Sequence, residues 1–194
     1  INSIETIKQL LYFLRPILQD DTDIPFQKSS ATSEDLADLE DEQFQVARIV
    51  HLAVHDDPNQ YFEMLELFKD QFYAGGEHRM KYTLPALIFC YIKLVRYIKQ
   101  CHEHSQEPES NVVTDDIDAA PLVSSKKRFY KGQIHVSYTK IFQILKGAAE
   151  KLVKIHPQSA LRLNLAIVNS ISEVDDHKEV KHIQKHVCLV ITHA

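Results

Sequence analysis

The sequence has no tryptophan and only four glycines among its 194 residues. It has no G-x-x-x-x-G-K loop for a phosphate and no G-x-S-x-G turn for a nucleophilic serine. The three cysteines are odd in number and show no C-x-x-C spacing, which favours free thiols in a reducing compartment. No apolar run approaches the roughly 18–20 residues that a membrane-spanning helix needs. These absences exclude the common signatures of nucleotide-binding, serine-hydrolase, disulfide-rich and membrane-spanning chains.

Apolar residues instead recur at helical spacing, and strict alternation typical of strands is absent. Pro16 is expected to bend or end the first helix, whereas Asp57-Pro58 forms an N-cap with a proline in the first turn. Gly75-Gly76 is expected to end the third helix in a left-handed cap, followed by a stiff turn and a helix that Thr83 caps. The pattern predicts seven helices: about 3–19, about 38–55, 58–74, about 83–102, 134–155, 160–171 and one opening at Asp176.

Seven helices joined mostly by short turns are compatible with a closed bundle or with a stack of helical hairpins. The helix at 83–102 is apolar on more than one face, which indicates neighbours on two sides. The chain also begins at Ile1 and ends at Ala194 within apolar-periodic segments, so we expect a fragment of a longer protein. Both features favour the stack: an all-α fold in which residues 1–194 form one α-solenoid segment.

Negative charge is concentrated between the expected helices. Residues 20–43 contain nine acidic side chains and one lysine, and residues 103–118 contain six acidic side chains without lysine or arginine. We expect mobile acidic linkers at about 20–37 and 104–127, as insertions at the edge of the solenoid. They either keep these segments solvated or leave the helices as a basic surface for an acidic partner or an anionic membrane.

Side chains that could carry chemistry are present but do not form a recognised site. His182 and His186 stand four residues apart, yet the acid and third ligand of a zinc site are missing, so no metal or other cofactor is predicted. Cys90, Cys101 and Cys188 lie on apolar helix faces, where a neutral thiol is expected. The basic residues that surround Phe129 and Tyr130 (Lys126, Lys127, Arg128 and Lys131) form a short cluster after an acidic linker. It favours a solvated helix start over nucleic-acid contact.

One stretch resembles a known family closely. Residues 74–85 have the form A-G-G-x-x-R-hydrophobic-basic-aromatic-T-L-P, and similar positions surround them: Asp41-Glu42-Gln43, Val46, Arg48, His51-Leu52, Asp57-Pro58, Leu87 and Phe89. The stretch resembles the C-terminal half of vacuolar protein sorting-associated protein 35, the large solenoid subunit of retromer. The strong similarity covers roughly residues 40–95, with a weaker echo at Leu161-Arg162-Leu163. The segment Ser105–Ser125 departs from the family, so the resemblance implies no function there.

The resemblance implies an α-solenoid of HEAT-like hairpins, in agreement with the helix pattern. It also implies a non-enzymatic scaffold that binds other retromer subunits, notably a small metallophosphoesterase-like one, and supports endosome-to-Golgi retrograde transport. Such a protein is cytoplasmic and reaches the endosomal membrane only through its partners; a generic helical-repeat adaptor with other partners is the alternative. The candidate partner-binding residues are Arg79, Lys81 and Tyr82 in the expected turn, and Lys93, Arg96 and Tyr97 on the following helix. The turn is expected to project Arg79 and Lys81 outward.

Overall fold

The computed structural model describes residues 1–19, 32–106 and 129–174, and within these ranges the chain is helical without any strand. The elements are α1 (Ile4–Gln19), α2 (Ser33–Ile49), the 3-10 helix η2 (Val50–Leu52), α3 (Pro58–Ala74), α4 (Gly76–Gln106), α5 (Tyr138–Ile155) and α6 (Pro157–Ser172). The predicted all-helical class is confirmed. The predicted helix that opens at Asp176 lies outside the described residues, as do His182, His186 and Cys188. No helix in the described ranges has both the length and the apolar character that crossing a membrane requires.

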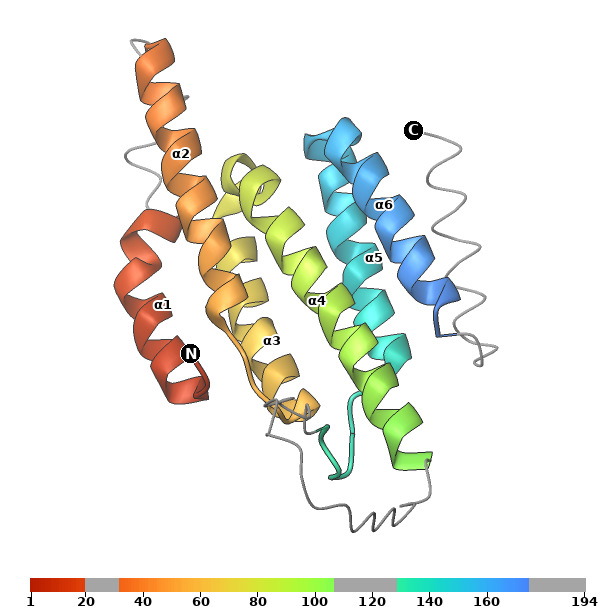
Figure 1. The fold of residues 1–194 in the computed structure, drawn as a ribbon. Helices are drawn as coiled ribbons and strands as arrows, with labels where there is room; N and C mark the ends of the chain where they lie inside the picture. Colours follow the sequence, from red (N-terminus) through yellow and green to blue (C-terminus); the bar gives the residue numbers. More distant parts are fainter. Residues whose placement is uncertain (20–31, 107–128, 175–194) are drawn as a thin grey trace, which may run out of the picture.

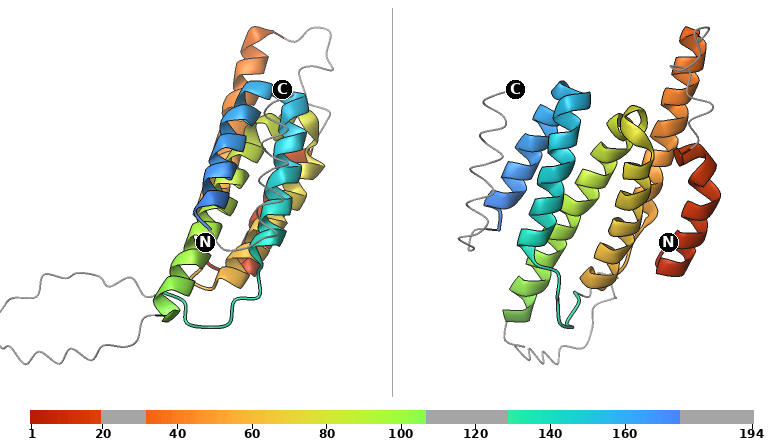
Figure 2. Two further views of the ribbon diagram at one scale, coloured as in Figure 1. Left: turned by 90° about the vertical axis from the view of Figure 1, so that its right-hand side faces the viewer. Right: turned by 180° about the vertical axis from the view of Figure 1, so that it is seen from behind.

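The helices form two layers of antiparallel hairpins rather than a closed bundle (Figure 1). Helix α1 packs against α3, whereas α2 and α6 both pack against α4. Helix α4 also packs against its hairpin partner α3 and against α5, which in turn packs against α6. The side view shows α2, α4 and α6 in one layer and α1, α3 and α5 in the other (Figure 2). The solenoid-like stack is therefore confirmed, and α4 has the neighbours on two sides that its apolar surface predicted.

The core lies between the two layers and is densest where α3 meets α4. Phe68 and Phe72 of α3 are almost fully buried, as are Leu84, Leu87 and Tyr91 of α4. The hydroxyl group of Tyr91 donates a hydrogen bond to Glu66 on α3, so this buried phenol has a polar partner. Because its inner side is fixed in this way, α4 can present its outer side as a stable surface.

The corner between α3 and α4 is tighter than the sequence predicted. Helix α4 begins at Gly76, so residues 77–82 are helical and Thr83 is buried inside the helix instead of capping it. Gly76 has a φ of 78°, the left-handed conformation that glycine adopts without strain, and it reverses the chain by itself. The hydroxyl group of Thr83 donates a hydrogen bond of 3.2 Å to the carbonyl oxygen of Arg79. The prediction of a stiff turn that projects side chains outward was wrong because one glycine completes the reversal.

Helix α1 continues through Pro16 to Gln19, close to the predicted bounds of 3–19, so of the two predicted effects of Pro16, a bend or an early end, the early end is wrong. The amide nitrogen of Gln43 on α2 donates to the carbonyl oxygen of Ile17 at 3.3 Å, which supplies a partner in the last turn. The backbone of this turn also lies directly on the α3–α4 corner. A Cβ atom placed on Gly75 would lie 2.5 Å from the carbonyl oxygen of Leu18, closer than real Cβ contacts. Gly75 is therefore required by close packing, and its φ of −73° does not require glycine.

Other helix boundaries also differ from the predictions, and α6 begins at Pro157 instead of 160. Helix α2 begins at Ser33, where Thr32 and Asp35 form a capping box, and ends at Ile49. The N-cap moves the helix start into the expected 20–37 linker, whose remainder lies outside the described residues.

Helix α5 begins only at Tyr138, after the Ser137 N-cap, and not at 134. Helix α4 runs to Gln106, so the expected linker from 104 also begins later, and Cys101 is buried in a regular helix.

Candidate partner-binding groove on helix α4

The outward face of α4 carries a row of side chains at helical spacing, of which only Ile92 also belongs to the core. Its members are Phe89, Ile92, Lys93, Arg96, Tyr97 and Gln100. Phe89 is 51% exposed although it is large and apolar. The sequence pattern predicted a neighbouring helix over this position, and the described residues leave it half open. A half-exposed aromatic side chain between basic residues is typical of a protein-binding surface.

This row forms one wall of a groove of about 620 Å³, which we call the α4 groove. The other walls come from the segment after η2, from α3 and from the segment before α5. They consist of Val54, His55, Asp56, Tyr61 and Phe129. Val54 was predicted to lie on a helix, but it follows η2 and is 51% exposed. The groove therefore combines residues from four parts of the chain, which no single sequence motif could show.

Hydrogen bonds and ring packing hold the walls of the α4 groove in place. The hydroxyl group of Tyr97 donates to the carbonyl oxygen of Asp56 at 2.7 Å. Burial raises the pKa of Tyr97 to about 12, so this hydroxyl remains a donor at neutral pH. Phe129 is stacked on His104 of α4, with ring centroids 4.0 Å apart. The groove is therefore formed before any partner arrives.

Two further hydrogen bonds fix the position of the segment between Phe129 and α5. The amide nitrogen of Asn59 donates to the carbonyl oxygen of Gln133 at 2.9 Å. The backbone N–H of His135 donates to the amide oxygen of Asn59 at 2.8 Å. Asn59 lies in the first turn of α3, so this single side chain ties the segment to the α3–α4 hairpin.

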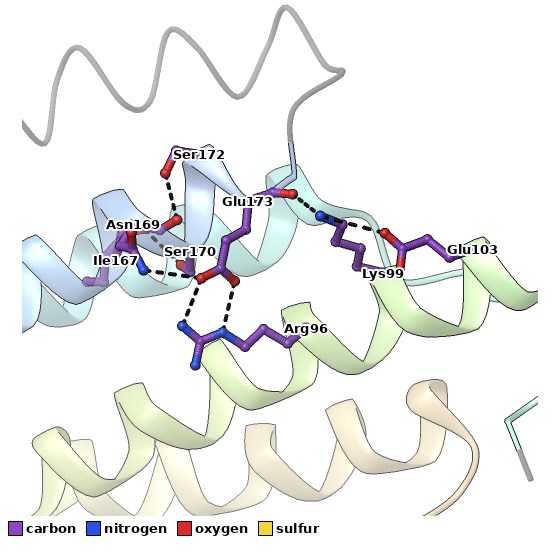
Figure 3. Close-up of polar contacts among 8 residues, drawn as sticks. All are labelled: Arg96, Lys99, Glu103, Ile167, Asn169, Ser170, Ser172 and Glu173. Carbon is purple, nitrogen blue, oxygen red and sulfur yellow. Dashed lines mark hydrogen bonds and ion pairs between the residues drawn. The ribbon is translucent and has the colours of Figure 1, made fainter. Parts of the chain in front are cut away.

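Arg96 is oriented by an ion pair on the side of α4 that faces α6 (Figure 3). Its Nε and one Nη atom donate to the two carboxylate oxygens of Glu173, at 2.9 and 3.0 Å. Glu173 is the C-cap of α6, and it also accepts a hydrogen bond from Asn169. The ammonium group of Lys99 donates to the Glu173 backbone carbonyl. The hydrogen bonds and charge of Arg96 lower the pKa of Glu173, so the pair is ionised at neutral pH.

Lys93 differs from Arg96 because no carboxylate of the described residues forms an ion pair with it. Its charge and that of Arg48 both act on His51, whose pKa is lowered first by burial and then by these two cations. The side chains of Lys93 and Arg48 are both exposed. The surface around Lys93 is therefore positively charged.

The remaining three predicted partner-binding residues lie elsewhere, at the start of α4. Arg79 is only 4% exposed, so the prediction that it projects outward was wrong: it lies in a helix whose first turns are packed against the corner. Tyr82 packs edge-on against Phe44 of α2, with ring centroids 5.1 Å apart. The ammonium group of Lys81 lies 4.4 Å from the Tyr82 ring centroid. The structure thus brings Lys93, Arg96 and Tyr97 together in one groove and separates them from these three.

The reactive side chains nearest the groove do not form a catalytic or metal site. The sulfur of Cys90 lies 3.2 Å from Nδ1 of His51, which resembles a thiol–imidazole pair. Burial raises the pKa of Cys90 to about 11, so the thiol is protonated at neutral pH and is a poor nucleophile. Within residues 1–19, 32–106 and 129–174, no three His, Cys, Asp or Glu side chains are grouped as metal ligands.

Two sequence comparisons with known proteins match this chain to one family. The family model described as vacuolar protein sorting-associated protein 35 matches residues 1–189. The chain is 26% identical over 177 residues to vacuolar protein sorting-associated protein 35A of Arabidopsis thaliana, which covers 91% of this chain and 19% of that protein. It is 32% identical over 85 residues to vacuolar protein sorting-associated protein 35 of Dictyostelium discoideum, which covers 44% of this chain and 10% of that protein. The chain thus spans about a fifth of the length of the first of these relatives. No solved structure matches it.

Proposed function

The chain belongs to the vacuolar protein sorting-associated protein 35 family, and from this membership we propose that it is a scaffold segment of the retromer coat. In this proposal the segment catalyses nothing and binds the small phosphoesterase-like subunit of the coat. The assembled coat supports transport from endosomes to the Golgi. The segment works in the cytoplasm and reaches the endosomal membrane only through its partners.

The observation that carries the proposal is the preformed α4 groove on a layered helical stack. A stack of hairpins offers a long, rigid side for holding another protein, because each hairpin is fixed by its neighbours. Lys93, Arg96 and Tyr97 of the predicted set line this groove, together with the exposed Phe89. Large aromatic and basic side chains at the centre of an interface usually contribute most of the binding energy.

Calorimetric titration of the chain with the small phosphoesterase-like subunit tests this function. Saturable binding with one-to-one stoichiometry is the expected result. If a folded and monodisperse chain shows no binding, the proposed partner is wrong, and the generic helical-repeat adaptor becomes the better explanation. Retention of other proteins by the folded chain would then identify which adaptor it is.

A further inference from the structure

Charge is distributed unevenly along the α4 groove. Lys93, in the middle of the α4 row, lies near His51 and Arg48, and no carboxylate of the described residues pairs with Lys93 or Arg48. One helical turn later, the acidic residue Asp56 is part of the groove lining, close to Tyr97. The groove therefore attracts an anionic group at Lys93 in particular and not along its whole length.

Beside Lys93, the floor of the groove is apolar. Phe89 and Val54 are each 51% exposed, and Ile92 and Tyr61 are buried behind them. Covering a half-exposed aromatic and a half-exposed valine would remove apolar surface from water, which favours association. The feature that matches this floor is an apolar or aromatic side chain on the partner.

Several other polar groups in the lining already have partners within the chain. Tyr97 donates to the carbonyl oxygen of Asp56, and Arg96 donates to both carboxylate oxygens of Glu173. Nδ1 of His55 accepts a hydrogen bond from the backbone N–H of Asp57. Among the described residues, the Lys93 ammonium group is thus the principal cation of the lining without an ion pair. One unpaired cation beside an apolar floor suits one carboxylate better than the continuous negative charge of a nucleic acid.

We propose that the α4 groove receives a loop of the small phosphoesterase-like subunit that carries an apolar or aromatic side chain next to a carboxylate. The apolar side chain lies on Phe89 and Val54, and the carboxylate pairs with Lys93. This inference rests on the proposed function, because it names the part of that partner which the groove recognises. It also assigns binding roles to Phe89 and Val54. Arg96 has a supporting role, because its ion pair with Glu173 fixes its position in the groove wall.

Two variants separate the two contacts when they are titrated with the small subunit by calorimetry at low and at high salt. Phe89→Ala removes the apolar contact, so we expect about tenfold weaker binding or more, with the salt dependence of wild type. Lys93→Gln removes the charge, so we expect binding weakened by about three- to tenfold at low salt and a flatter salt dependence. The matched controls are Phe13→Ala on α1, where Phe13 is 75% exposed, and Lys154→Gln, an exposed position on α5. Both controls are expected to bind like wild type.

The outcomes separate this inference from the function on which it rests. If wild type binds the small subunit and both groove variants bind equally well, the groove assignment is overturned while the proposed function stands. If Phe89→Ala weakens binding but Lys93→Gln leaves the salt dependence unchanged, the carboxylate contact is overturned. If wild type is folded and does not bind the small subunit at all, the proposed function is wrong, and the proposal that a loop of this subunit occupies the groove is wrong with it. Circular dichroism of each variant establishes that the changes in binding do not come from unfolding.

Discussion

The two halves of helix α4 use similar residue types in opposite ways. The first half, from Gly76 to Pro85, contains Arg79, Lys81 and Tyr82, and its sequence matches the family most specifically. In the structure Arg79 and Thr83 of this half are both buried. The second half contains Lys93, Arg96 and Tyr97, and there Phe89 is half exposed in the α4 groove. The first half maintains the fold, whereas the second half offers a surface to a partner.

This difference decides which residues report on binding. Arg79 is buried, and Arg96 is joined to Glu173 at the end of α6. A charge reversal at either arginine would disturb the packing of helices as well as any contact with a partner. Phe89 is half exposed, and Lys93 has no ion pair with the described residues. Variants at these two positions therefore test binding with little effect on the fold. We therefore expect stability effects to be large in the first half of α4 and small in the second.

The largest expected effect is at the corner, at Gly75. Its substitution Gly75→Ala would place a Cβ atom 2.5 Å from the carbonyl oxygen of Leu18, a backbone atom that cannot move without shifting α1. We expect the free energy of unfolding to fall by about 2–3 kcal/mol, as in other overpacked sites. Urea denaturation followed by circular dichroism measures this change.

Gly147→Ala provides the matched control because the same atom is added in open space. Gly147 lies inside α5 and nothing lies within 4 Å of the added Cβ atom. Alanine favours the helix over glycine, so this variant should be more stable than wild type by about 0.5–1 kcal/mol. If Gly75→Ala were as stable as wild type, α1 would not lie on the corner as the structure shows.

The next largest effect is expected at Thr83, which lies one helical turn after Arg79. Thr83 is fully buried, and its hydroxyl group has a single described partner, the carbonyl oxygen of Arg79. Replacement by valine keeps the shape and removes this hydrogen bond, so we expect a loss of about 1 kcal/mol in the free energy of unfolding. An unchanged unfolding midpoint in the same urea experiment would contradict this role of the hydroxyl group.

Much of the fold could be predicted from the sequence because caps and apolar spacing are local signals. Asp57 caps α3 with Pro58 in its first turn, and α5 ends at Ile155, both as predicted. The prediction failed where a distant part of the chain supplies the cause. The spacing around Gly75 could not show that α1 lies on the corner, and Pro16 could not show that α2 supports the last turn of α1.

The candidate site was only half predictable for the same reason. Lys93, Arg96 and Tyr97 follow from helical spacing on α4, and they do lie in one groove. Val54 and Phe129 come from segments far apart in the chain, and only the packing of those segments against α4 shows that they meet. The separate roles of Lys93 and Arg96 also depend on Glu173, 77 residues away from Arg96. A sequence pattern records charge, but a tertiary contact decides whether that charge is available.

A smaller effect is expected for Glu173→Gln, which breaks the ion pair that joins α4 to α6. The pair is partly exposed, with side-chain exposures of 50% and 35%, so solvent screening keeps the loss to about 0.5–1 kcal/mol. The folded pKa of Glu173 is lowered, so its contribution is complete above the ordinary carboxyl pKa and disappears as the pH falls through the lower folded value. Wild type and variant should therefore differ near neutral pH and converge in acid. Glu63→Gln, on the exposed side of α3, should show no difference at either pH.

The smallest effect is expected for Lys93→Gln in the absence of a partner. Lys93 has no ion pair among the described residues, and a second cation, Arg48, lies close enough for both charges to lower the pKa of His51. Removing its charge relieves a mild repulsion, so the free energy of unfolding should stay within about 0.5 kcal/mol of wild type or rise slightly. Urea denaturation at low salt, where this repulsion is strongest, is the sensitive measurement. A clear loss of stability would show that Lys93 supports the fold as Arg79 does, and the contrast between the two halves of α4 would no longer hold.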